Sequence, residues 1–213
     1  MSGNHSPKIE LLPIEKKWLD AITNIYLEVY RDKMNFSRSL GKAFVNKTYT
    51  WFCENSCSFG FIAIVDGNPA GFIVACEPDH RKKLNQYRFM TGLRQVVLRP
   101  WLLLSGSVIN VLLDEAVKVF NKNKIRRVDF NNNDSLNLYS LAVLPKYSQN
   151  RISNLLLTEC ENHALKMNKR IIFCYISSQN RSSLLLHHLM GYSIDKMRSN
   201  ENGMCFYKII EKE

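Results

Sequence analysis

The stretch LAVLPKYSQNRISNLLL, from Leu141 to Leu157, indicates more about the fold of this chain than any other. An apolar run typical of a strand ends at Pro145, a polar loop follows, and apolar residues from Ile152 onward recur at helical spacing. Strand, loop and helix in this order often form a phosphate cradle, because free N–H groups at a helix N-terminus attract anions. Such loops usually contain glycine, and this one contains none. The stretch alone therefore leaves two interpretations, a cradle without glycines and an ordinary connection.

Segments of both helical and strand character surround this stretch. The predicted helices are Glu15–Arg31, a second one capped by Ser37 and running to about Cys53, Ile152–Lys166, and Arg181–Met190 capped by Asn180. The predicted strands are Lys8–Leu12, two in a hairpin over Phe59–Cys76, Leu138–Leu144, Arg170–Ser177, Tyr192–Met197 and Met204–Ile210. This order predicts one α/β (α+β) domain over residues 1–213, with a mixed sheet.

A basic and apolar insertion, residues 77–134, interrupts that order. Within it, Leu93–Phe120 has a helical and very apolar pattern that Pro100 and Ser105-Gly106 should break into shorter pieces. Residues 80–127 hold 11 Lys and Arg but only two acids, so they carry nearly all of the net charge of +10. Such a local charge predicts contact with something anionic rather than general binding to nucleic acid.

The composition indicates a cytoplasmic globular protein. No window approaches the roughly 18 uninterrupted apolar residues of a membrane span, and the N-terminus has no apolar core of a secretory signal. Six cysteines are scattered, and Cys53 and Cys57 lack the second Cys or His pair that would complete a zinc site. The other four cysteines lie in apolar segments, where buried free thiols are common. We therefore expect reduced thiols, no metal and no transmembrane segment.

Three stretches together resemble the GNAT superfamily of acetyl-CoA-dependent N-acetyltransferases. VDGNPAGFIVA (65–75) is similar to the family's strand-turn-strand, which commonly reads DG-xx-G. Leu141 to Ala164 resembles the acetyl-CoA motif, in which a strand ending in V-x-P-x-Y/F leads to Q/R-x-x-G-x-G/A and a helix. NRSSLLLHHLMGY (180–192) resembles the closing N-x-x-A motif with its following aromatic and glycine. The resemblance implies a GNAT-like acyl-CoA N-acyltransferase fold, a mostly antiparallel sheet flanked by helices.

The resemblance also implies a binding site for acetyl-CoA, the donor co-substrate. In this family a splayed strand pairs with the pantetheine amides, and the next helix N-terminus receives the pyrophosphate. Here Arg151 and Ser153 replace the two glycines, and Ser148 stands where Gln or Arg is usual. The loop either still binds coenzyme A or has decayed. The residues that the resemblance assigns to the donor are Leu141, Ala142, Val143, Ser148, Gln149, Asn150, Arg151, Ile152, Ser153, Asn154 and Asn180.

Two residues are candidates for proton transfer. His187 falls where the family often has the tyrosine that protonates the leaving thiolate, and an imidazolium can act as a general acid. The strand lacks the Glu that many relatives use as a general base. Glu77 is the first substitute, and Asp79, a water relay or no base at all are the alternatives.

The acceptor implied by the resemblance is a primary amine of a small molecule. In a ternary complex, this amine would attack acetyl-CoA directly and take up the acetyl group. The basic insertion could hold an anionic acceptor such as an amino sugar or nucleotide sugar. It could also form a homodimer, touch a membrane surface through residues 80–127, or simply pack against the sheet. A non-catalytic GNAT-like binding or regulatory protein and an acyltransferase with a longer donor remain alternatives.

Overall fold

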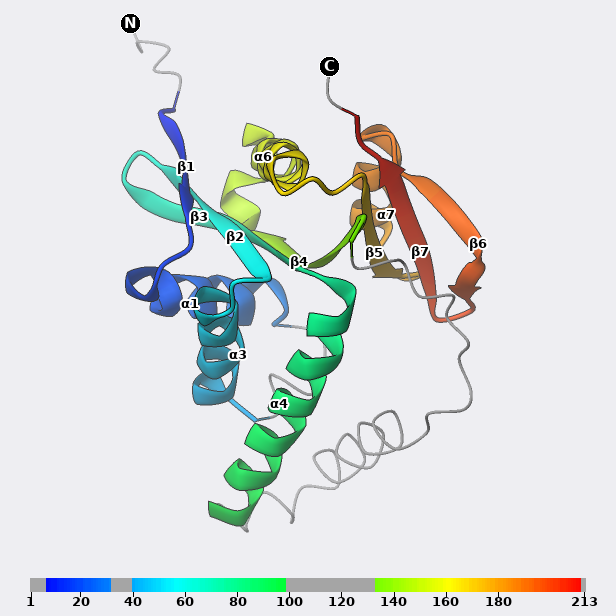
Figure 1. Ribbon diagram of the computed structural model, residues 1–213. Coiled ribbons are helices and arrows are strands. Elements are labelled where there is room, and N and C mark those ends of the chain that lie inside the picture. The colour runs from blue at the N-terminus through cyan, green and yellow to red at the C-terminus, as the bar shows by residue number, and fades with distance from the viewer. Residues whose placement is uncertain (1–6, 32–39, 99–132, 212–213) are drawn as a thin grey trace, which may run out of the picture.

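A computed structural model of the chain describes residues 7–31, 40–98 and 133–211 (Figure 1). The predicted cap at Ser37 lies outside these residues, as do residues 99–132 of the insertion, which include most of the segment 80–127 predicted to contact a membrane. Within the described part, no helix is both long enough and apolar enough to cross a membrane.

Seven strands form one sheet in the order β1-β2-β3-β4-β5-β7-β6 (Figure 1). Every neighbouring pair is antiparallel except β4 and β5, which are parallel. The mixed, mostly antiparallel sheet that the sequence predicts is therefore confirmed. The strands are β1 (Ile9–Pro13), β2 (Ser58–Val65), β3 (Asn68–Cys76), β4 (Ser135–Val143), β5 (Ile171–Ser177), β6 (Ser193–Asn200) and β7 (Gly203–Ile209).

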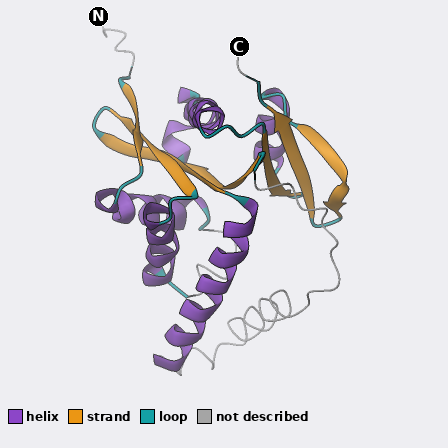
Figure 2. Cartoon of the chain, viewed as in Figure 1, coloured by secondary structure: helices purple, strands orange, loops and turns teal. Residues whose placement is uncertain are grey.

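Helices cover both faces of the sheet (Figure 2). One core lies between the sheet and α1, α3 and the start of α4, and the other lies between the sheet and α6 and α7. Because β2 and β3 are enclosed on both faces, their residues are apolar in unbroken runs instead of alternating. The helices are η1 (Lys16–Trp18), α1 (Leu19–Val29), α3 (Lys42–Glu54), α4 (Pro78–Leu98), η3 (Pro145–Asn150), α6 (Ile152–Lys166) and α7 (Arg181–Leu189).

The insertion begins differently from the prediction. Helix α4 starts at Pro78, whereas the sequence pattern predicts helix only from Leu93. Its first three turns are polar and charged, so they lack the apolar stripe by which a helix is recognised in a sequence. Pro78 suits the first turn of a helix, where an N–H would have no intrahelical acceptor.

The β2–β3 hairpin explains the glycines of the DG-xx-G pattern. Asp66 and Gly67 have φ values of 46° and 79°, the left-handed conformations that a tight two-residue hairpin turn requires. Gly71 serves another purpose, because a Cβ at this position would lie 2.8 Å from the Ala142 carbonyl oxygen on β4. The missing side chain therefore allows β3 and β4 to approach closely.

The six cysteines are all free thiols. Four of them, Cys76, Cys160, Cys174 and Cys205, are buried as the sequence predicts. Burial raises the pKa of the Cys76 thiol to about 12, so this group stays protonated at neutral pH.

Candidate functional site

The sheet opens between β4 and β5. These parallel strands pair only from Ser135 to Asn137 on β4, opposite Ile171 to Phe173 on β5. Beyond that point β4 continues beside β3, and β5 continues beside β7. At the last pair the Asn137 side-chain amide donates to the Phe173 carbonyl oxygen at 3.3 Å. Beyond Asn137 the edge of β4 that faces β5 is therefore not paired with that strand, and we call this separation of the two strands the opening.

The direction of the backbone groups along this edge follows from one hydrogen bond. The Leu144 N–H donates to the Ala70 carbonyl on the β3 side at 2.8 Å. Successive residues of a strand point their backbone groups to opposite edges, so those of Leu141 and Val143 point into the opening. Those of Ala142 point to β3, consistent with its carbonyl lying against Gly71. Of the three predicted strand residues, Leu141 and Val143 thus offer backbone groups to a ligand.

The loop after β4 retains the shape of a cradle without its glycines. Arg151 ends η3 with φ 52° and ψ 22°, the left-handed conformation that glycine would adopt without strain. Its carbonyl accepts from the N–H groups of Asn154 and Leu155 at 3.0 and 3.1 Å. No side chain caps α6, and the N–H groups of Ile152 and Ser153 find no acceptor among the described residues. Two N–H groups without an acceptor in the described part of the chain therefore stand at the N-terminus of α6, directly after Arg151.

The remaining loop residues divide into exposed and enclosed groups. Ser148 and Gln149 are exposed beside the cradle, and nothing is described of the Asn150 side chain. Ile152 is buried in the core, so it contributes only its N–H to the site. The Asn154 side chain donates to the Met190 sulfur at 3.4 Å, which turns it toward α7.

Asn180 begins helix α7. Its side-chain oxygen accepts from the Ser183 N–H at 3.5 Å, as in an N-cap. The predicted cap is confirmed, and it fixes where α7 starts. A contact of Asn180 with the donor remains a prediction.

His187 is enclosed between α7 and β7. Its side chain is only 2% exposed, and its ring lies 5.0 Å from that of Tyr192 and 6.0 Å from that of Phe206. Nδ1 lies 2.8 Å from the Ser183 carbonyl oxygen, while Nε2 is buried without a partner in the described part of the chain. Burial lowers the pKa of His187, opposed by the Ser183 hydrogen bond and by the Glu161 charge. These features favour a packing role, and the role of general acid stays a prediction.

The burial of His187 should make stability depend on pH. Because the native pKa lies below the ordinary 6.5, the unfolded chain takes up the proton more readily, and stability falls as the pH drops below 6.5. We expect His187→Phe to lose part of that dependence, at most about 1.4 kcal/mol per pH unit. Thermal melting between neutral and mildly acidic pH measures this pH dependence of stability. His188→Phe, which changes an exposed neighbouring histidine, is the control. Equal pH profiles for the wild type and His187→Phe would contradict it.

Glu77, the predicted base, is held in an ion pair. It follows β3 directly, and its Oε1 accepts from the Lys169 Nζ at 2.8 Å. Its Oε2 lies 3.6 Å from the His80 Nδ1. The Lys169 ion pair holds the carboxylate at the closed end of β4, so the geometry does not favour Glu77 as a base. Asp79, the alternative, is exposed in the first turn of α4.

Two tyrosine hydroxyls that the sequence did not single out contact β4. The Tyr30 hydroxyl donates to the Leu141 carbonyl oxygen at 3.4 Å, on the open edge of β4. The Tyr49 hydroxyl donates to the Ser140 Oγ at 3.3 Å. Burial raises the pKa of both tyrosines, so both hydroxyls stay protonated. In the sequence these tyrosines have the spacing of core aromatics. That spacing predicts burial but gives no sign of their hydrogen bonds to β4.

The described part of α4 carries basic residues on the side of the sheet that α1 and α3 cover. The Arg81 guanidinium lies 5.0 Å from the ring centre of Tyr175 on β5, and that of Arg88 lies 5.8 Å from the Phe44 ring. Lys83 and Arg94 are exposed. Some of the predicted positive charge is thus stacked on aromatic rings instead of being fully solvated.

Comparison with known proteins now identifies the family. The model of the Acetyltransferase (GNAT) family matches residues 19–192. The chain belongs to this family. Among curated proteins, none matches its sequence.

Solved structures of the GNAT family share the fold at low sequence identity. The PaiA N-acetyltransferase from Thermoplasma acidophilum, in complex with coenzyme A, is 13% identical with a TM-score of 0.58, over 95% of this chain and 99% of that one. An aminoglycoside N-acetyltransferase in complex with CoA is 12% identical with a TM-score of 0.57, over 89% and 91%. The ribosomal-protein-S18-alanine N-acetyltransferase from Escherichia coli is 13% identical with a TM-score of 0.57, over 97% and 96%. At these identities the likeness establishes the fold.

Proposed function

We propose that this GNAT member transfers an acetyl group from acetyl-CoA to a primary amine of a small molecule. The observation that carries the proposal is the open edge of β4 leading directly into the cradle at Arg151. The backbone groups of Leu141 and Val143 would pair with the pantetheine amides. The N–H groups of Ile152 and Ser153, with the Arg151 cation, would receive the pyrophosphate. The two solved relatives that hold coenzyme A support this choice of donor.

The chemistry needs few groups beyond correct positioning. The neutral amine nitrogen attacks the thioester carbonyl carbon, the C–S bond breaks, and the thiolate leaves with the bonding electrons. A backbone N–H on the open edge of β4, such as that of Val143, would polarise the carbonyl oxygen. The proton that the amine loses would go to solvent, because the described residues place no free carboxylate on β4.

The proposed acceptor class rests on the charge of α4. The cations of α4 favour an anionic amine, such as an amino sugar or a nucleotide sugar, over a neutral one. A cytoplasmic location, a homodimer and peripheral membrane contact are consistent with the composition and stay predictions.

A second candidate is a non-catalytic binding protein of the same fold. Two observations favour it: β4 carries no carboxylate side chain, and Arg151 holds a strained left-handed conformation in place of glycine. An acyltransferase with a longer donor is the third candidate, since the unpaired edge of β4 begins at Asn137, before the proposed pantetheine contacts at Leu141 and Val143.

A donor titration separates these candidates. We expect acetyl-CoA and coenzyme A to raise the melting temperature in proportion to the logarithm of their concentration, because both bind only the native state. Loss of acetyl-CoA in the presence of a panel of anionic amines, followed by chromatography, then measures transfer. No thermal shift at millimolar acetyl-CoA would refute donor binding. Binding without transfer to any amine would support the non-catalytic candidate, and a stronger shift with longer acyl-CoA thioesters would indicate another donor.

A further inference from the structure

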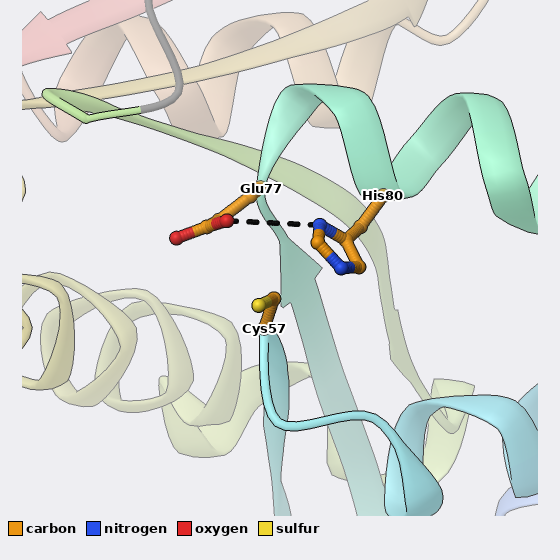
Figure 3. A group of neighbouring side chains, drawn as sticks. All are labelled: Cys57, Glu77 and His80. Carbon is orange, nitrogen blue, oxygen red and sulfur yellow. Dashed lines mark ion pairs between the residues drawn. The ribbon is translucent and has the colours of Figure 1, made fainter.

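Three side chains with metal-binding atoms meet at the start of α4, at the closed end of the sheet (Figure 3). One ligand atom each from Cys57, Glu77 and His80 lies within 4.8 Å of the other two. We propose that these residues form a binding site for a divalent transition metal ion of the zinc class. The site is separate from the cradle and does not depend on the acyl transfer proposed above.

The backbone brings the three residues together by short-range contacts. The Glu77 N–H donates to the Cys57 carbonyl at 3.1 Å, which extends the β2–β3 pairing one residue beyond Ser58 and Cys76. Cys57 and Glu77 are therefore cross-strand neighbours. His80 follows Glu77 by three residues in the first turn of α4, so its side chain lies on the same side of the helix.

The ligand types and their separations suit zinc. A thiolate, an imidazole nitrogen and a carboxylate oxygen are the ligands that Zn²⁺ prefers. In a tetrahedral site with bonds of about 2.0 to 2.1 Å, a nitrogen and an oxygen ligand lie about 3.4 Å apart. The His80 Nδ1 and the Glu77 Oε2 are 3.6 Å apart. These two atoms already lie near the separation of bound ligands, and the Cys57 Sγ, within 4.8 Å of both, would be the third ligand.

One atom of the group lacks a partner that a metal would supply. The His80 Nδ1 is buried and has no hydrogen bond within the described residues, because the Glu77 Oε2 at 3.6 Å is beyond hydrogen-bond distance. A buried polar atom without a partner is costly, and a metal ion at this position would satisfy it. A water molecule would take the fourth tetrahedral position.

Lys169 fixes the orientation of Glu77. Its side chain is 6% exposed, and its Nζ donates to the Glu77 Oε1 at 2.8 Å and to the Asn133 carbonyl at 3.4 Å. The Glu77 Oε2 is thereby directed to His80, as outer hydrogen bonds commonly direct metal ligands. The positive charge of Lys169 opposes a cation, but metal binding displaces the Cys57 thiol proton, and the thiolate balances that charge.

Bound metal would join the end of the β2–β3 hairpin to the start of α4. We therefore expect Zn²⁺ to raise the melting temperature of the metal-free protein. Co²⁺, which has a visible spectrum, should give the d–d bands of a tetrahedral site and a thiolate-to-cobalt charge-transfer band. Absence of the charge-transfer band at saturating Co²⁺ would overturn the proposal.

Matched variants separate this site from adventitious binding. Cys57→Ser should lose the charge-transfer band, and His80→Ala should weaken Co²⁺ binding roughly tenfold or more. The controls are Cys53→Ser, which removes a partly exposed thiol, and His188→Ala, which removes an exposed imidazole. Neither should change the charge-transfer band or the affinity for Co²⁺. Unchanged binding in Cys57→Ser would assign the metal to other residues and refute the site.

A measurement on the unaltered chain covers the case in which a variant fails to fold. Zn²⁺ should slow alkylation of Cys57 but not of Cys53, with each thiol followed by mass spectrometry of its own peptide. Equal rates for Cys57 with and without Zn²⁺ would refute the proposal regardless of how the variants behave.

Discussion

Replacing Arg151 with aspartate should weaken acetyl-CoA binding by roughly tenfold to a hundredfold, provided the cradle binds pyrophosphate. The change removes a cation that can form charge-assisted hydrogen bonds, each worth about 1.5 to 3 kcal/mol. It also places a carboxylate beside the free N–H groups of Ile152 and Ser153, where it repels the phosphates and competes for those donors. Isothermal titration with coenzyme A measures the affinity directly.

Two further variants show which property of Arg151 matters. Lys47→Asp makes the same change of charge at an exposed position on α3 and should leave coenzyme A affinity nearly unchanged. Arg151→Gly removes the cation but also relieves the left-handed strain, so it should stabilise the fold by about 1 kcal/mol while weakening binding less than aspartate does. Equal affinity for the wild type and Arg151→Asp would show that the cradle does not hold the donor.

Adding one methyl group at Gly71 should reduce both stability and donor binding. The new Cβ would lie 2.8 Å from the Ala142 carbonyl oxygen and 2.8 Å from the Val143 Cγ2, closer than such atoms can approach. Overpacking of this kind costs about 1 to 3 kcal/mol, which chemical denaturation of Gly71→Ala would measure. Because the displaced atoms belong to the end of β4, the open edge and the cradle should shift as well.

Gly60→Ala is the matched control for this effect. A Cβ at Gly60 would lie 2.5 Å from the Ile73 carbonyl oxygen, so this variant should be destabilised at least as much. Its conflict lies between β2 and β3, and it reaches β4 only indirectly, through the pairing of Ile73 with Leu141. We therefore expect Gly60→Ala, once folded, to bind coenzyme A normally. An equal loss of affinity in both variants would mean that general destabilisation, not the position of β4, governs binding.

Local patterns in the sequence predicted much of the fold. Helix α6 runs from Ile152 to Lys166, as its apolar spacing predicts, and Asn180 caps α7. The Asp66-Gly67 turn lies where the hairpin was expected. Each of these features depends on residues within a few positions of one another, and periodicity, capping and turn chemistry act over that range.

Some site assignments did not follow from local patterns. The resemblance predicted His187 as a general acid, whereas the structure shows its ring packed against Tyr192 and Phe206 in the core. Glu77 is an ordinary acid in the sequence, whereas its partner Lys169 is 92 residues away. The sequence showed which residue types were present but not which of them the fold would enclose.

The amino-acid sequence by itself determined the order of the elements, the family motifs and the absence of glycine from the loop after β4. Only the tertiary structure decided that Arg151 adopts the glycine conformation, that β4 opens from β5 after Asn137, and that Cys57 meets Glu77 and His80. The physical reason is the range of the interactions. Helix periodicity and caps are set by neighbours along the chain, whereas strand separation and the enclosure of a side chain depend on segments that meet only after folding.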